Sequence, residues 1–303
     1  EPREEETTAH INLGELTNPP DMKDNGLLGS GAWGSVYHRL WKGKDTAAKV
    51  FYHTVPVKLQ HRELGVMKFL ADNSPHPFVV LLYGVVRDPQ LVLVMEFCSG
   101  GSLQDVTRMV EFDSNQRLAV LSQVSSAMAH VHSIGILHRD LKADNVMFLH
   151  AIGPGDMPIS KVGDFGLGKR LDEKNLTASP LMPAGYTPGP WYAPEIASNT
   201  IHGRKADVYA FGALIVEVIL GLNDAADWWP PEDVNTALTG FDIRGLGLLM
   251  RSCLEPKPDP RPDMKHCVQV VAQGTPAEIA AIREWLPCGE YEEEEEEGEE
   301  GAQ

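Results

Sequence analysis

The sequence predicts an α+β fold with two lobes, a small β-rich lobe followed by a larger helical lobe. Residues 22–96 contain short apolar runs bounded by turn residues, such as residues 91–94, which are typical of strands. After residue 101 apolar side chains recur every three or four residues, which is the period of an α-helix. Ligands often bind where two such units meet, so we expect a cleft between the lobes.

The composition excludes several classes of protein. The chain has 303 residues and a net charge of −17, so it lacks the excess of Lys and Arg that binding to nucleic acid requires. It contains no apolar run of about 18 residues, and therefore no membrane span within this fragment. The chain begins at Glu1, so a leader or span outside the fragment stays an open alternative.

Three further segments flank or interrupt this picture. Residues 1–21 are a polar lead-in with little core of its own, and residues 274–289 are expected to form a C-terminal helical extension. Nine glutamates make residues 290–303 an acidic tail that we expect to be disordered, because like charges repel. The tail either aids solubility or binds a basic partner.

The four scattered cysteines indicate a reducing, intracellular location, in the cytoplasm or alternatively the nucleus.

The β-rich lobe begins with a glycine-rich segment, Gly29-Ser30-Gly31-Ala32-Trp33-Gly34. Glycines let backbone N–H groups approach a phosphate closely. A strand-like run including Val36 follows, where a dinucleotide-binding fold would have a long helix, so we expect a hairpin flap. The alternative is an ordinary tight turn.

A lysine and a glutamate of this lobe are candidates for an ion pair. Lys49 lies among small and apolar residues on a predicted strand, and Glu63 lies on a predicted helix over residues 61–70. If both face the cleft, Glu63 orients Lys49. Each residue is otherwise an ordinary solvated surface charge.

Two helices of the second lobe have clear signals. Asp113 and Gln116 are spaced as a capping box before an amphipathic helix, and Gly135 is expected to end it. Residues 206–220 are apolar nearly all round, which predicts a helix buried inside the lobe.

The strongest chemical signal is His138-Arg139-Asp140-Leu141-Lys142-Ala143-Asp144-Asn145. Its aspartate, lysine and asparagine suit a loop that accepts a proton, neutralises phosphate and holds a metal. Asp164-Phe165-Gly166 adds a carboxylate suited to Mg²⁺, and Ala193-Pro194-Glu195 follows. The ordered set is far more specific than any one of these motifs.

Taken together, these motifs resemble those of eukaryotic-type protein kinases over about residues 22–273. Lys142 within the catalytic motif, with Gly101-Ser102-Leu103 and Trp191-Tyr192-Ala193-Pro194-Glu195, is similar to serine/threonine kinases of the tyrosine-kinase-like group. The resemblance implies a bilobal kinase fold. Its N-lobe (22–96) would be a small antiparallel sheet with one main helix, and its C-lobe (97–273) helical.

The resemblance also implies a reaction, the transfer of the γ-phosphate of ATP to Ser or Thr hydroxyls of a protein substrate. Asp140 would act as the base and Lys142 would steady the γ-phosphate. Lys49, fixed by Glu63, would hold the α- and β-phosphates. Asn145 and Asp164 would bind Mg²⁺.

Other roles implied by the resemblance concern ATP and the internal bracing. The flap residues over ATP would be Leu28, Gly29, Ser30, Gly31 and Gly34. The adenine would lie among Val36, Ala47 and Met147, with Met95 behind it and the backbone of residues Glu96 to Cys98 beside it. Met67, Leu82, His138 and Phe165 would stack across the lobes. Asp207 would brace the catalytic loop, and Arg261 would pair with Glu195.

The segment between Asp164 and Glu195 carries a further expectation and one departure. Arg139 would recruit a phosphate on one of four hydroxyl residues, namely Thr177, Ser179, Tyr186 and Thr187. Serine/threonine kinases usually place a threonine seven residues before the glutamate of the Ala-Pro-Glu motif, where this chain has Pro188. This puts the local loop shape and the substrate preference in doubt.

Four alternatives stay open from the sequence. The first is a catalytically inactive kinase-fold scaffold, although such a protein would normally lack Lys49, Asp140 or Asp164. The second is a binding module that uses its acidic tail. The third is a kinase that acts on a small molecule, and the fourth is a tyrosine or dual-specificity kinase.

Overall fold

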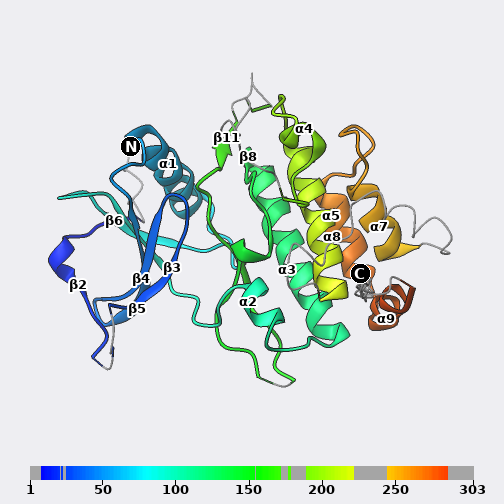
Figure 1. The fold of residues 1–303 in the computed structure, drawn as a ribbon, viewed down its shortest axis with the longest axis horizontal. Coiled ribbons are helices and arrows are strands. Elements are labelled where there is room, and N and C mark those ends of the chain that lie inside the picture. The colour runs from blue at the N-terminus through cyan, green and yellow to red at the C-terminus, as the bar shows by residue number, and fades with distance from the viewer. Residues whose placement is uncertain are drawn as a thin grey trace, which may run out of the picture.

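The computed structural model describes residues 8–20, 22, 25–153, 155–171, 177–178, 189–221 and 244–285. A β-rich lobe and a larger helical lobe lie side by side (Figure 1), so the prediction of an α+β, two-lobed fold is confirmed. Among the described helices, none has both the length and the apolar character that a membrane span needs.

The N-lobe is a curled sheet with one long helix against it. The strands follow the order β1-β6-β7-β5-β4-β2, and β3 pairs with β4. The strand pairs are antiparallel except β1 with β6, which is parallel. The elements are β1 (Ala9–His10), β2 (Leu16–Thr17), β3 (Leu27–Ser30), β4 (Gly34–Trp41), β5 (Lys44–Phe51), α1 (Val57–Asn73), β6 (Leu82–Val86) and β7 (Val92–Glu96).

The lead-in contributes more to the N-lobe than its polar sequence suggested. Strands β1 and β2, with the 3₁₀ turn Leu13–Glu15 between them, extend the sheet at both edges. Ile11 is 5% exposed and packs with Val86, Val92 and Val94. Gly84 makes room for this segment, because a Cβ there would lie 2.6 Å from the Ala9 carbonyl oxygen.

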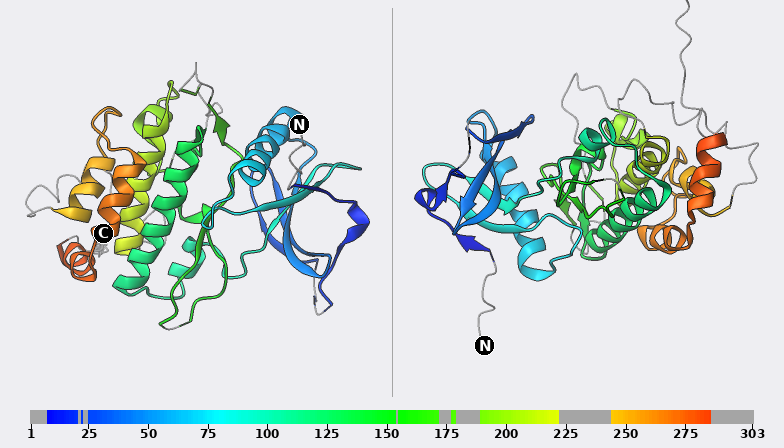
Figure 2. Two further views of the ribbon diagram at one scale, coloured as in Figure 1. Left: turned by 180° about the vertical axis from the view of Figure 1, so that it is seen from behind. Right: turned by 90° about the horizontal axis from the view of Figure 1, so that it is seen from below.

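The C-lobe is built around two long helices (Figure 2). Its helices are α2 (Leu103–Thr107), α3 (Ser114–Ser133), α4 (Pro194–Ala197), α5 (Arg204–Leu220), α7 (Gly245–Cys253), α8 (Met264–Gln273) and α9 (Pro276–Trp285), with the 3₁₀ turn Ala143–Asn145. Two short antiparallel ladders face the N-lobe, and their strands are β8 (Ile136–Leu137), β9 (Val146–Phe148), β10 (Ser160–Val162) and β11 (Lys169–Arg170). Ile279 and Ile282 bury helix α9 in the same core.

The local signals in the sequence account for the two central helices. The capping box of α3 is present, since Asp113 accepts the backbone N–H of Gln116 while the Gln116 side chain accepts the N–H of Asp113. Gly135 follows the helix with φ +76°, a conformation that glycine adopts without strain. Helix α5 is buried along most of its length, as its apolar sequence predicted.

Candidate active site

Lys49 lies at the centre of an ion-paired group between the lobes. It stands on β5, opposite Val36 of β4 and Leu93 of β7. Its Nζ is 2.6 Å from Glu63 Oε1 on α1 and 3.0 Å from Asp164 Oδ1. The predicted pair of Lys49 and Glu63 therefore forms, and Asp164 joins it from the other lobe.

Burial and charge act against each other in this group. Burial favours the neutral form of Lys49, but the charges of Asp164 and Glu63 outweigh it and raise its pKa well above the usual value. Burial also tends to raise the pKa of Asp164, but Lys49 holds it below the usual range. Burial raises the pKa of Glu63, and the nearby carboxylate of Asp164 adds to this effect. The lysine therefore stays charged.

The backbone around Asp164 fixes the carboxylate in place. Asp164 has φ +51°, and its Oδ1 accepts the N–H of Gly166 at 3.2 Å. A Cβ at residue 166 would lie 3.0 Å from Asp164 Oδ1 and 3.2 Å from Glu63 Oε2, so glycine keeps this space open. The next residue, Phe165, is fully buried with its ring 4.7 Å from that of His138. Met67 and Leu82 are buried in the same hydrophobic core as Phe165, and their stacking across the lobes stays a prediction.

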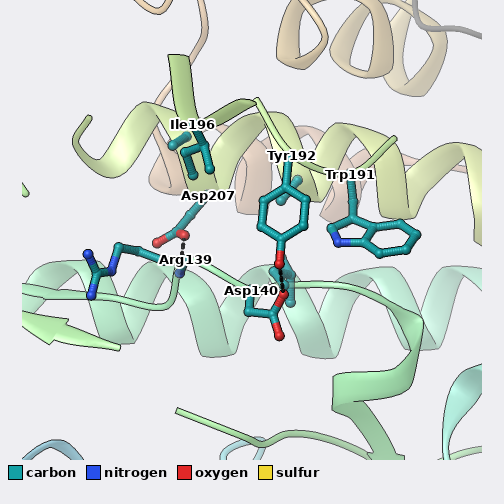
Figure 3. Close-up of a pocket in the computed structure, with 9 residues that line it drawn as sticks. Arg139, Asp140, Trp191, Tyr192, Ile196 and Asp207 are labelled. Carbon is teal, nitrogen blue, oxygen red and sulfur yellow. Dashed lines mark hydrogen bonds between the residues drawn. The ribbon is translucent and has the colours of Figure 1, made fainter. Parts of the chain in front are cut away.

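Asp140 is held by three polar neighbours within the C-lobe. Its Oδ2 accepts Asn145 Nδ2 at 3.0 Å, and Lys142 Nζ lies 3.8 Å from the same oxygen. Its Oδ1 accepts the hydroxyl of Tyr192 at 2.6 Å (Figure 3). Burial raises the pKa of Asp140, while Lys142 and the Tyr192 hydroxyl act to lower it. The structure thus brings Asp140, Lys142 and Asn145 together as predicted.

Asp207 on α5 binds the backbone of the catalytic loop. It is 1% exposed and accepts the backbone N–H groups of His138 at 2.9 Å and Arg139 at 2.7 Å. His132 Nε2 donates to it at 2.8 Å. Burial alone would raise the pKa of Asp207, but the hydrogen bond from His132 and the neighbouring donors lower it below the usual value. This contact, predicted from the resemblance, is confirmed.

The predicted pair of Glu195 and Arg261 is also present. Arg261 donates to both carboxylate oxygens of Glu195, at 2.6 Å and 3.0 Å, and is itself 1% exposed. Because a guanidinium binds a carboxylate best through two parallel bonds, this pair fixes α4 to the C-lobe.

The residues predicted to lie around the adenine come from strands of both lobes. Ala47 pairs with Met95 across β5 and β7, Val36 lies on β4, and Met147 lies on β9. Glu96 has a second contact, because its carboxylate accepts Lys161 Nζ at 2.8 Å. Burial raises the pKa of the Cys98 thiol to about 12, which favours its neutral form.

The flap residues form the hairpin that the sequence predicted. Leu28, Gly29 and Ser30 lie on β3, Gly31 lies in the turn, and Gly34 begins β4. A Cβ at Gly34 would overlap the Val50 carbonyl oxygen, so the hairpin requires glycine at this position. Among the described residues, no side chain of the flap forms a hydrogen bond or an ion pair with Lys49, and the flap's role toward ATP remains a prediction.

Of the four predicted phosphate acceptors, only Thr177 lies within the described residues, where it is exposed. Ser179, Tyr186, Thr187 and the departure at Pro188 lie outside them. Arg139 Nε donates to the Leu167 carbonyl at 2.7 Å. Burial, with the like charge of Arg62, lowers the pKa of Arg139 to about 10.

Sequence reasoning missed the contact of Tyr192 with Asp140. Tyr192 was read only as part of the Trp191-Tyr192-Ala193-Pro194-Glu195 motif. It lies 52 residues from Asp140 along the chain, and no local pattern joins the two.

Three known proteins named as kinases are similar to this chain in sequence. At 29% identity over 287 residues, the chain is similar to "Putative L-type lectin-domain containing receptor kinase II.2" of Arabidopsis thaliana, covering 82% of this chain and 39% of the relative. At 28% over 276 residues it is similar to "Putative serine/threonine-protein kinase/receptor R826" of Acanthamoeba polyphaga mimivirus, covering 86% and 16%. At 32% over 196 residues it is similar to "Serine/threonine-protein kinase STE20" of Saccharomyces cerevisiae, covering 64% and 20%.

The chain therefore spans well under half the length of these relatives. The sequence model of the family described as "Protein tyrosine and serine/threonine kinase" matches residues 22–271, which include every residue of the site described above. The chain belongs to the protein tyrosine and serine/threonine kinase family.

Proposed function

We propose that this chain transfers the γ-phosphate of ATP to Ser or Thr hydroxyls of protein substrates. The observation that carries the proposal is the continuous group of Lys49, Glu63 and Asp164, which joins the lobes beside a catalytic loop in which Asp140 and Asn145 are hydrogen-bonded. The names of the relatives support serine and threonine as acceptors.

The residues present fit a divalent cation. Asp164 offers a carboxylate whose side chain is 44% exposed. The Asn145 amide donates through Nδ2 to the backbone oxygen and to Oδ2 of Asp140, so its own amide oxygen is not engaged by Asp140. Carboxylate and amide oxygens are the ligands that Mg²⁺ prefers. When bound, Mg²⁺ would neutralise charge on the phosphates.

The residues also fit a triphosphate. The Lys49 ammonium has three donors, of which Glu63 and Asp164 take two, so one is left for a phosphate oxygen. The glycine hairpin above it supplies backbone N–H groups. Lys142, 3.8 Å from Asp140, lies where it would steady the transferred phosphate.

Asp140 is the base in this proposal. It accepts the proton of the substrate hydroxyl as that oxygen bonds to the γ-phosphorus, and the bond from phosphorus to the bridging oxygen of ADP breaks. Most of the catalysis is positioning and charge neutralisation, which the ion pairs and the Asp207 brace provide.

The proposal predicts that Lys49→Met lowers phosphorylation of a serine/threonine peptide array by roughly 10²- to 10³-fold with Mg·ATP. Lys44→Met is the matched control on the same strand. Among the described residues, the only hydrogen bond of Lys44 Nζ is the one to the Tyr83 hydroxyl, at 2.7 Å. Equal activity of wild type and Lys49→Met would contradict the proposal, as would wild-type protein that labels tyrosine peptides alone.

A further inference from the structure

The hydroxyl of Tyr192 makes a short contact with the base of the proposed reaction. It donates to Asp140 Oδ1 at 2.6 Å, and Tyr192 is 6% exposed. Figure 3 shows the phenol pointing at the carboxylate from the segment that precedes α4. A hydrogen bond from a hydroxyl to a buried carboxylate is among the stronger ones in proteins.

Tyr192 is held firmly to the C-lobe. Its backbone N–H donates to the Gly189 carbonyl at 3.0 Å, and three residues later the Glu195–Arg261 pair anchors α4. Its neighbour Trp191 lies with its ring beneath Lys142 Nζ, 5.4 Å from the ring centre. Tyr192 therefore cannot move away from Asp140 without disturbing these contacts.

The two carboxylate oxygens of Asp140 have different donors. Oδ2 accepts Asn145 Nδ2 from the catalytic loop, and Oδ1 accepts Tyr192. With a donor on each oxygen the carboxylate cannot rotate freely. A carboxylate oxygen can accept a second hydrogen bond, so a substrate hydroxyl can still reach it.

We propose that Tyr192 is a positioning residue for Asp140, which fixes the orientation of the carboxylate that the substrate hydroxyl approaches. This inference rests on the proposed kinase function. The alternative is that Tyr192 blocks Asp140 and that the substrate must displace it. The firm anchoring of residues 191–195 argues against this alternative.

The test compares Tyr192→Phe with the control Tyr83→Phe, which removes a hydroxyl bound by Lys44 from half-buried Tyr83 on β6. Tyr192→Phe should lower kcat for a serine peptide by about 10-fold or more, with KM for Mg·ATP unchanged. Tyr83→Phe should match wild type.

A second readout needs no nucleotide. The ¹³Cγ signal of Asp140, assigned as the signal missing in Asp140→Asn, should shift between wild type and Tyr192→Phe at one fixed pH, because Oδ1 loses its donor. Unchanged kcat together with an unchanged Asp140 signal would overturn the inference. A rise in kcat/KM for the peptide in Tyr192→Phe would also overturn the inference, and would indicate that Tyr192 blocks Asp140.

If Tyr192→Phe does not fold, difluorotyrosine at position 192 keeps the shape and makes the phenol more acidic. Activity should then fall at high pH, where the phenolate can no longer donate to Asp140. An alkaline limb identical to that of wild type overturns the inference. Wild-type protein without transfer activity would contradict the proposed function, and with it this inference. Active wild-type protein whose activity is unchanged by Tyr192→Phe would contradict the inference alone.

Discussion

The two ends of the site are held together in different ways. At the phosphate end, Lys49, Glu63 and Asp164 come from β5, α1 and the loop after β10, and they carry full charges across the junction of the lobes. At the hydroxyl end, Asp140 is held inside the C-lobe, through hydrogen bonds from Asn145 and Tyr192. The comparison teaches that the phosphate end depends on how the lobes sit together, whereas the hydroxyl end does not require the N-lobe.

The largest expected effect separates the two ends directly. Asp140→Asn and Asp164→Asn should each lower kcat by roughly 10²- to 10³-fold, because each removes a charge that the reaction needs. Asp164→Asn should weaken the binding of Mg·ADP more than Asp140→Asn does, because Asp164 pairs directly with Lys49 whereas Asp140 contacts the proposed cation site only through Asn145. Calorimetric titration with Mg·ADP measures this difference. Equal weakening in both variants would show that the two ends are not independent.

A smaller effect is expected when the phosphate end loses one of its carboxylates. Glu63→Gln leaves Lys49 paired with Asp164 alone, so the lysine is less firmly oriented. We expect kcat/KM for ATP to fall about 10-fold, while the free energy of unfolding changes by less than about 2 kcal/mol, because Asp164 still neutralises the lysine. Initial rates and chemical denaturation measure the two quantities.

The matched control for Glu63→Gln is Glu111→Gln. Glu111 pairs with Arg283 at 3.0 Å, but its side chain is 75% exposed. Exposed pairs contribute little, so stability and activity should both stay near wild type. If Glu63→Gln behaves like this control, the buried pair has no part in orienting Lys49.

The smallest expected effect concerns the carboxyl group of Glu217. Burial, with the nearby charge of Asp144, raises the pKa of Glu217 on α5 from 4.5 to about 8. A carboxyl group whose pKa is higher in the folded state contributes stability that is full below the unfolded pKa and is lost as pH rises through the folded one. Wild-type stability should therefore decline between about pH 5 and pH 8.

Glu217→Gln tests this decline. Residue 217 is partly exposed, so the effect is modest, and we expect the fall in Tm between pH 6 and pH 8.5 to shrink by about 2 °C. Glu284→Gln, at an exposed position on α9, should leave the pH dependence unchanged. Scanning calorimetry at several pH values measures both variants, and an identical slope in wild type and Glu217→Gln would contradict the assignment.

Several features of the fold could be predicted because their causes are local. The cap of α3 depends on Asp113 and Gln116, three residues apart, and the flap depends on glycines within one turn. The bracing contacts of Asp207 and Arg261 were predicted from the resemblance, and the structure contains both. The bounds of the elements were less accurate, since α1 extends over Val57–Asn73 and not only residues 61–70.

Other features had no local cause. Strand β1 lies in a polar segment, and it is ordered by pairing with β6 and by a bond from Thr8 to Asp72, 64 residues away. Glu96, predicted from the resemblance only for its backbone, uses its side chain to bind Lys161. These contacts depend on how separate elements pack, which a pattern within one element does not show.

The sequence by itself determined the residue types of the site, the order in which they occur and the helices and hairpin that carry them, because those follow from neighbours a few residues apart. Only the tertiary structure decided which charges meet. Lys49 and Asp164 are 115 residues apart and Tyr192 and Asp140 are 52 apart, and each pair forms because packed elements bring the side chains together. The physical reason is that a buried charge must find a partner, and the packing of the lobes determines which partner is within reach.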